Sequence, residues 1–225
     1  MTGAIRHVGL LVAKDLRIEA RSRQTLGLVI MLGVLIIVVL GLGLGAQKSA
    51  SAFAAPAILW VAYLFGGVMC FEKTMAVERH DGALAGLMLS PVDPGVIYVC
   101  KLLTNVVLML VLAVVITPVA IVLFNFDLSA APGSFAFVML LSIIGFAAVG
   151  TLFAATVSST RLQGGLLAMA LFPICLPLVI TSTQMLLRLF RDSQAVGGSG
   201  LAVLIAFDVI YLVVSWIVFE LVLEP

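Results

Sequence analysis

The chain has 225 residues, of which 63% are hydrophobic and only 10% are charged, whereas an average soluble domain has about 25% charged residues. This composition excludes an ordinary water-soluble protein and favours a membrane protein. The formal net charge is +1, and a chain without an excess of basic residues is not expected to bind nucleic acid.

Residues 4–23 are predicted to form an amphipathic helix that precedes the first long apolar run. Lys14, Arg17 and Arg21 follow one face of this helix. A basic amphipathic helix next to a membrane segment is expected to lie in the headgroup plane, with its apolar face toward the lipid. A soluble helix that packs on a partner is the alternative interpretation. The apolar stripe consists of Ile5, Val8, Val12 and Leu16.

Six apolar runs follow, and each is long enough to cross a bilayer as a helix, which takes about 20 residues. The first run is too long for the apolar core of a secretory signal peptide, so it is interpreted as a retained membrane helix. Prolines inside the third and fifth runs are expected to bend those helices. The sequence therefore predicts an all-α integral membrane protein with one transmembrane domain, 1–225. The predicted spans are 25–46, 53–71, 97–124, 135–157, 164–186 and 201–223.

Positive charges are distributed unevenly between the two ends of the predicted spans. Nine of the 12 Lys and Arg residues fall on one side, and only Lys48, Arg188 and Arg191 fall on the other. Because cytoplasmic loops retain Lys and Arg, the richer side is predicted to be cytoplasmic. Both termini lie on that side.

The cytoplasmic connection between the second and third spans runs from Glu72 to Pro94 and is predicted to contain a short helix, which ends at Ser90-Pro91. Charged residues in its first half are followed by apolar residues in its second half. Those apolar side chains would form an exposed patch unless a partner or the membrane surface covered them. A solvated loop is the alternative interpretation.

The external connection at 186–200 contains Arg188 and Arg191, followed by the glycine-rich stretch at 197–200. It is predicted to form a short or partly re-entrant helix before the last span. Its two Arg side chains are candidates for contact with an external partner, or they anchor helix ends to lipid phosphates.

The sequence contains few of the groups that catalysis requires. It has no G-x-x-x-x-G-K-[ST] motif, so the chain is not expected to hydrolyse ATP itself. Both histidines, His7 and His80, fall in predicted cytoplasmic surface segments, where neither can activate a nucleophile at membrane depth. The three cysteines do not form a C-x-x-C pair. No catalytic residue and no metal site are predicted.

Asp208 is the main ionisable residue inside a predicted span, about seven residues after the start of the last one. Ionisable groups inside membranes often belong to ion or proton pathways. An ion-coupled secondary carrier that uses Asp208 is therefore an alternative function. The other interpretation is that Asp208 caps or hydrogen-bonds a neighbouring helix.

The order of these elements resembles the permease subunits of ABC transporters of the ABC-2 type. Within that group, FEKTMAVERHDGALAGLMLSPVDPGVIYVCK at 71–101 is similar to the signature of the haem exporter protein B family (CcmB), which takes part in cytochrome c maturation. The stretch VAKDLRIEARSRQTL at 12–26 is similar to the same family. The resemblance covers essentially the whole chain.

The resemblance implies that 75–89 is a coupling helix, which docks in a groove of a separate ATPase subunit. Glu72 would lie at the membrane end of the second span, where it could pair with the interfacial helix or with the ATPase. Charged and apolar residues of the connection would make the remaining contacts. The implied ATPase-coupling residues are Glu72, Glu78, Arg79, His80, Asp81, Leu84, Leu87 and Met88.

The resemblance also implies a complex in the bacterial inner membrane. Its other members would be an ABC ATPase subunit, a haem-handling membrane protein with its small companion, and a periplasmic haem chaperone. Arg188 and Arg191 are the candidate contacts for the chaperone. Haem and ATP would be handled by these partners, so no cofactor is assigned to this chain. An ABC-2 exporter of a lipid, a polysaccharide or a drug has the same architecture and is an alternative.

Overall fold

The computed structural model describes residues 2–22, 24–44, 48–80, 94–125, 131–158, 165–192 and 198–223. Over these ranges the chain consists of helices and short turns, without any strand, which confirms the all-α prediction. The helices are α1 (Thr2–Ser22), α2 (Gln24–Gly43), α3 (Lys48–His80), α5 (Pro94–Phe124), α6 (Pro132–Ser158), α7 (Gly165–Asp192) and α8 (Ser199–Leu223).

Six of these helices are long and apolar enough to cross a membrane, and they correspond one to one with the six predicted spans. A continuous apolar helix suits a bilayer because all of its backbone hydrogen bonds are made within the segment. The prolines expected inside the third and fifth spans lie within α5 and α7. The apolar segments are Leu26–Gly43, Phe53–Ala76, Gly95–Phe124, Pro132–Val157, Gly165–Phe190 and Ser199–Phe219.

Two helices extend beyond the ends of their predicted spans. α3 continues past residue 71 to His80, so residues 75–80 belong to the spanning helix and do not begin a separate one. α7 continues past residue 186 to Asp192, so the first half of the expected external helix is also part of a span. In both cases the extra residues include no Gly or Pro, and nothing in the sequence ends the helix there.

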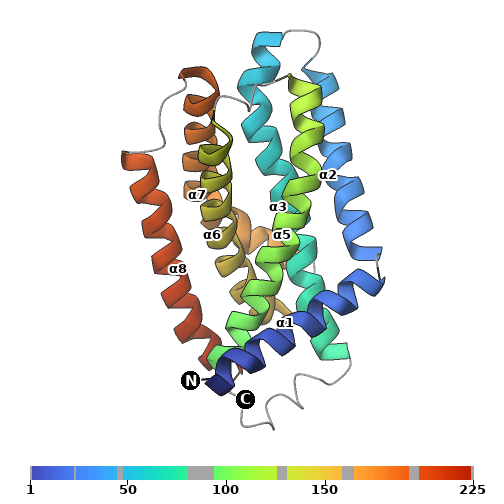
Figure 1. Ribbon diagram of the computed structural model, residues 1–225, viewed down its shortest axis with the longest axis vertical. Helices are drawn as coiled ribbons and strands as arrows, with labels where there is room; N and C mark the ends of the chain where they lie inside the picture. The colour runs from blue at the N-terminus through green and yellow to red at the C-terminus, as the bar shows by residue number, and fades with distance from the viewer. Residues whose placement is uncertain are drawn as a thin grey trace.

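The six spanning helices form a bundle, and α1 crosses one end of it (Figure 1). The two chain termini and the C-terminal end of α3 lie at this same end, while the C-terminal end of α7 lies at the opposite end (Figure 1). α3 and α6 contain the largest shares of buried residues among the spans, whereas α2 and α8 have the smallest. The centre of the bundle is therefore built on α3 and α6.

The core contains a cluster of aromatic side chains from α3 and α6. Trp60 meets both Tyr63 and Phe146 edge to face, with ring centroids 5.9 and 6.4 Å apart. The Trp60 indole N–H donates a hydrogen bond to the hydroxyl of Ser182 on α7, at 3.0 Å. The Tyr63 hydroxyl is 2.8 Å from that of Thr117 on α5. Hydrogen bonds of this kind between membrane helices are worth about 0.6 kcal/mol each.

Candidate coupling site

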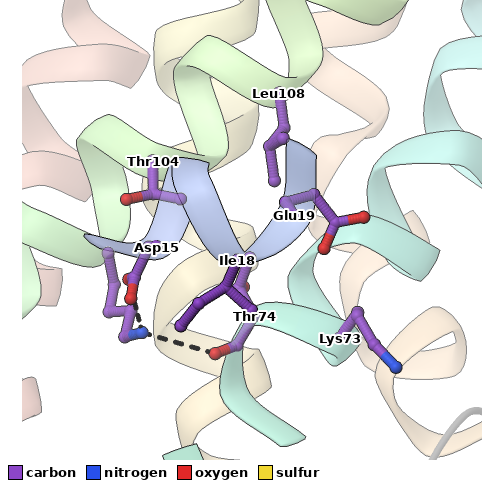
Figure 2. Close-up of a pocket in the computed structure, with 8 residues that line it drawn as sticks. Asp15, Ile18, Glu19, Lys73, Thr74, Thr104 and Leu108 are labelled. Carbon is purple, nitrogen blue, oxygen red and sulfur yellow. Dashed lines mark hydrogen bonds and ion pairs between the residues drawn. The ribbon is translucent and has the colours of Figure 1, made fainter. Parts of the chain in front are cut away.

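α1 is fastened to the bundle mainly through α5. Asp15 of α1 forms an ion pair with Lys101 of α5, with 2.6 Å between the carboxylate oxygen Oδ2 and Nζ. The Lys101 ammonium also donates to the backbone carbonyl of Thr74 on α3, at 3.4 Å. Figure 2 shows both contacts as dashed lines. Lys101 is only 4% exposed, and a charge so deeply buried requires oxygen partners such as these.

A second set of polar contacts continues from Thr74 into the bundle. The Thr74 hydroxyl donates to Oδ1 of Asn105 on α5, at 2.9 Å. The Asn105 amide in turn donates to the hydroxyl of Thr151 on α6, at 2.9 Å. Asn105 and Thr151 are fully buried. We call Asp15, Lys101, Thr74, Asn105 and Thr151 the junction network, because together they join α1, α3, α5 and α6.

A small cavity lies beside the junction network, between α1, α3 and α5 (Figure 2). Its volume is about 20 Å³, which is room for a water molecule and not for an organic ligand. The buried carboxylate of Glu19 lies in its wall, and Lys73 is exposed at its edge. The lining residues are Asp15, Ile18, Glu19, Lys73, Thr74, Lys101, Thr104 and Leu108.

The predicted amphipathic helix is present as α1, but its apolar stripe does not face only lipid. Val8, Val12 and Leu16 are half-buried, and Leu16 packs against the bundle core. Among the described side chains of α1, the large apolar ones that are exposed are Leu10, at 60%, and Ile18, at 41%. The reason is the ion pair with Lys101, which holds the inner face of α1 against α5.

Only part of the predicted ATPase-coupling set lies in described residues. Glu72 is half-buried on α3, two residues before Thr74, and therefore next to the junction network in the chain. Glu78, Arg79 and His80 lie in the last turns of α3, but their side chains are outside the described set. Four predicted contacts lie wholly outside the described residues, namely Asp81, Leu84, Leu87 and Met88.

The other predicted site residues lie away from the junction network. Arg188 is exposed near the C-terminal end of α7, at the opposite end of the bundle (Figure 1). Arg191 belongs to the last turn of the same helix, and its side chain is outside the described residues. Asp208 lies in α8 and is buried.

The sequence does not reveal the junction network, although it contains one signal for it. Asp15 and Glu19 follow Val8 and Val12 on one face of α1, at spacings of seven and eleven residues from Val8. Two acidic residues on the inner face of an amphipathic helix require a cation in the structure they pack against. Lys101 is the only charged residue of α5. The hydroxyl and amide groups deeper in the bundle gave no comparable pattern.

Six apolar spanning helices, a helix across one end and a buried polar junction beneath it define a multi-pass α-helical membrane protein. The family model described as CcmB protein matches residues 6–223. The chain therefore belongs to the CcmB family, the haem exporter B family of ABC transporter permeases in cytochrome c biogenesis. This confirms the resemblance found in the sequence. No curated protein matches the chain in a comparison of whole sequences.

Proposed function

We propose that this chain is the membrane subunit of an ABC complex that couples ATP hydrolysis by a separate ATPase subunit to haem delivery. The output would be release of a haem-loaded periplasmic chaperone. Family membership supports a permease role in cytochrome c maturation. The single observation that supports coupling is the continuity of α3 with the junction network, since α3 leads directly into the connection at 81–93.

The proposed path of movement begins where the ATPase would dock, on the residues around 75–89. A displacement there would act on the C-terminal end of α3, which is one rigid helix through Thr74. Thr74 would move Lys101 and with it α1, because the Lys101 ammonium is bonded to both. Thr74 would also move α6 through Asn105 and Thr151. The residues of this chain would perform no chemical step.

The proposal assigns the two ends of the bundle to two sets of partners. The end crossed by α1 would face the cytoplasm and the ATPase. The opposite end, which carries Arg188 and Arg191, would face the periplasm of a bacterium, with the haem chaperone and the haem-handling membrane protein. The exposed side chain of Arg188 suits contact with acidic protein surfaces or lipid phosphates.

The proposal is tested by purifying the tagged complex from native membranes with the double substitution Glu78→Ala and Arg79→Ala. We expect most of the co-purifying ATPase activity to be lost, together with c-type cytochromes, while the amount of this chain in the membrane stays the same. Lys48→Ala, at the other end of α3, is the matched control and should retain the ATPase. Retention of both ATPase and cytochromes in the double variant would contradict the coupling role.

The same purification distinguishes the cargo. If an ATPase co-purifies without any haem-bearing partner, the permease role still holds, but the substrate is a different one, such as a lipid, a polysaccharide or a drug. If no ATPase co-purifies with the unsubstituted chain, the proposed coupling to a separate ATPase subunit is wrong.

A further inference from the structure

Asp208 lies near the middle of the last span. It is the tenth of the 21 residues in Ser199–Phe219, and only 4% of its surface is exposed. Neither carboxyl oxygen has a hydrogen-bond partner among the described residues. A buried polar group without a partner is rare in native structures and requires an explanation. Inside a membrane it is a candidate functional site.

The Asp208 carboxyl packs directly on the backbone of α6. A Cβ atom built on Gly145 would collide with Oδ1 of Asp208, and it would lie only 2.8 Å from Leu178 of α7. Gly145 and Leu178 are each the fourteenth of 26 residues in their own spans. The carboxyl is therefore enclosed by α6, α7 and α8 near the middle of the membrane, in the space that the absence of a side chain at Gly145 provides.

No charged group faces this carboxyl from the helices around it. α6 contains no titratable residue, the charged residues of α7 all lie in its last two turns, and Lys101 is the only charged residue of α5. On α8 itself, Glu220 is twelve residues away, about 18 Å along the helix. The uncharged titratable side chains of α7 and α8 are the thiol of Cys175 and the phenol of Tyr211, and neither can supply a positive charge.

An ionised carboxylate cannot be stable in this environment, since the described residues supply neither a counter-ion nor a hydrogen-bond donor. We propose that Asp208 is a proton-binding site at the middle of the membrane, occupied by a proton in the closely packed arrangement of α6, α7 and α8 described above. Loss of the proton to water requires α8 to separate from α6, because only then can water reach the carboxyl. The proposal does not depend on the coupling function.

A proton fits this site better than a metal ion or an organic cation. Metal ions such as Ca²⁺ or Mg²⁺ need about six oxygen ligands, and no group of three acidic, His or Cys side chains occurs in the described parts of the chain. Oδ1 of Asp208 occupies the space beside Gly145, and only 4% of the residue is exposed, so the site suits a proton better than a larger ligand. Asp208→Asn keeps the shape of the neutral acid and removes the site, which makes it the natural test variant.

The first test is infrared spectroscopy of the purified full-length chain in lipid at neutral pH. We expect a carbonyl band of a protonated carboxylic acid, which Asp208→Asn abolishes and which remains in the matched control Asp192→Asn, at the end of α7. If the band is unchanged in Asp208→Asn, the carboxyl is ionised and the proposal is wrong.

The second test measures the separation of α8 from α6 as a function of pH. The Ser215 hydroxyl donates to the carbonyl of Ala148 at 3.3 Å, so Ala148→Cys and Ser215→Cys give a cross-linking pair in a chain whose three native cysteines are replaced. We expect cross-linking of this pair to fall as the pH rises, by up to about tenfold for each pH unit, relative to the same pair in the Asp208→Asn variant. Identical pH profiles with and without Asp208→Asn would overturn the proposal.

Discussion

At the scale of single residues, the ion pair between Asp15 and Lys101 gives the sharpest expectation. Lys101→Ala leaves the carboxylate of Asp15, whose side chain is only 10% exposed, without its buried partner. Removing one member of a buried ion pair typically lowers stability by about 3–5 kcal/mol. We therefore expect a large drop in the thermal unfolding midpoint of the purified protein in detergent.

Lys14 provides the control for this prediction. It also pairs with Asp15, at 3.4 Å, but its side chain is 41% exposed. Exposed ion pairs contribute only about 0–1 kcal/mol, so Lys14→Ala should change the midpoint little. The combination of Asp15→Asn with Lys101→Met should recover part of the loss, because no uncompensated charge then stays buried. Equal effects of Lys14→Ala and Lys101→Ala would show that burial does not determine the strength of this pair.

The sequence reveals single residues unevenly. Asp208 stands out because a carboxylate inside an apolar run is conspicuous, and it is indeed buried. In the sequence, Lys101 is informative only as one of the positive charges that indicate membrane orientation. The spacing of charged residues does not identify Asp15 as its partner. Spacing shows which residues share a helix face, but it does not show which face meets which neighbour, since Asp15 and Lys101 are 86 positions apart.

At the scale of helices, the unbroken length of α3 is the feature to test. Ala76→Pro removes a backbone N–H and clashes with the carbonyl four residues earlier, which disrupts a helix interior by about 3 kcal/mol. The break would lie in the turn that contains Thr74, before Glu78 and Arg79, which are proposed to contact the ATPase. We expect the ATPase to co-purify while the yield of c-type cytochromes falls severely.

Ala76→Ser is the matched control for the proline substitution, because it keeps the backbone N–H and adds only a hydroxyl. It should support cytochrome production at nearly the normal level. Normal cytochrome yield with Ala76→Pro would mean that a rigid α3 is not needed for coupling.

The sequence predicts that each spanning helix exists, but it predicts less accurately the residues at which the helices end. Each span could be identified because an uninterrupted run of about 20 apolar residues is typical of a helix that crosses a bilayer. Hydropathy, however, marks where the apolar stretch stops, and a helix continues until a residue ends it. α3 therefore runs nine residues beyond its predicted end at 71, and α7 runs six beyond its predicted end at 186.

At the scale of the whole molecule, the prediction concerns orientation. Both termini lie at the end crossed by α1, and the C-terminal end of α7 lies opposite (Figure 1). We expect a membrane-impermeant thiol reagent to label Arg188→Cys in intact spheroplasts, and to label Lys14→Cys only after the membrane is broken. The side chain of Arg188 is exposed, and that of Lys14 is 41% exposed, so the reagent can reach both positions. The opposite labelling pattern would place the termini outside the cell.

The arrangement of the spans in the bundle could not be predicted from composition. All six are apolar on most sides, so the hydrophobic pattern does not say which helices are neighbours. The choice depends on local shape, such as the enclosure of Asp208 against Gly145, and the contact of the Phe71 ring with Gly150. The sequence shows both glycines but not what fills the space beside them.

The position of α1 has a consequence for how the protein is made. α1 is the first helix to leave the ribosome, yet it makes few contacts with α2 and most of its contacts with α5. The chain must therefore be extended by more than 70 residues, through α2 and α3, before Lys101 can reach Asp15. Until then α1 can bind only α2, through its few contacts with that helix, and the lipid surface. Closure of this ion pair thus marks the point in biosynthesis when the first two spans have been made and the third has begun.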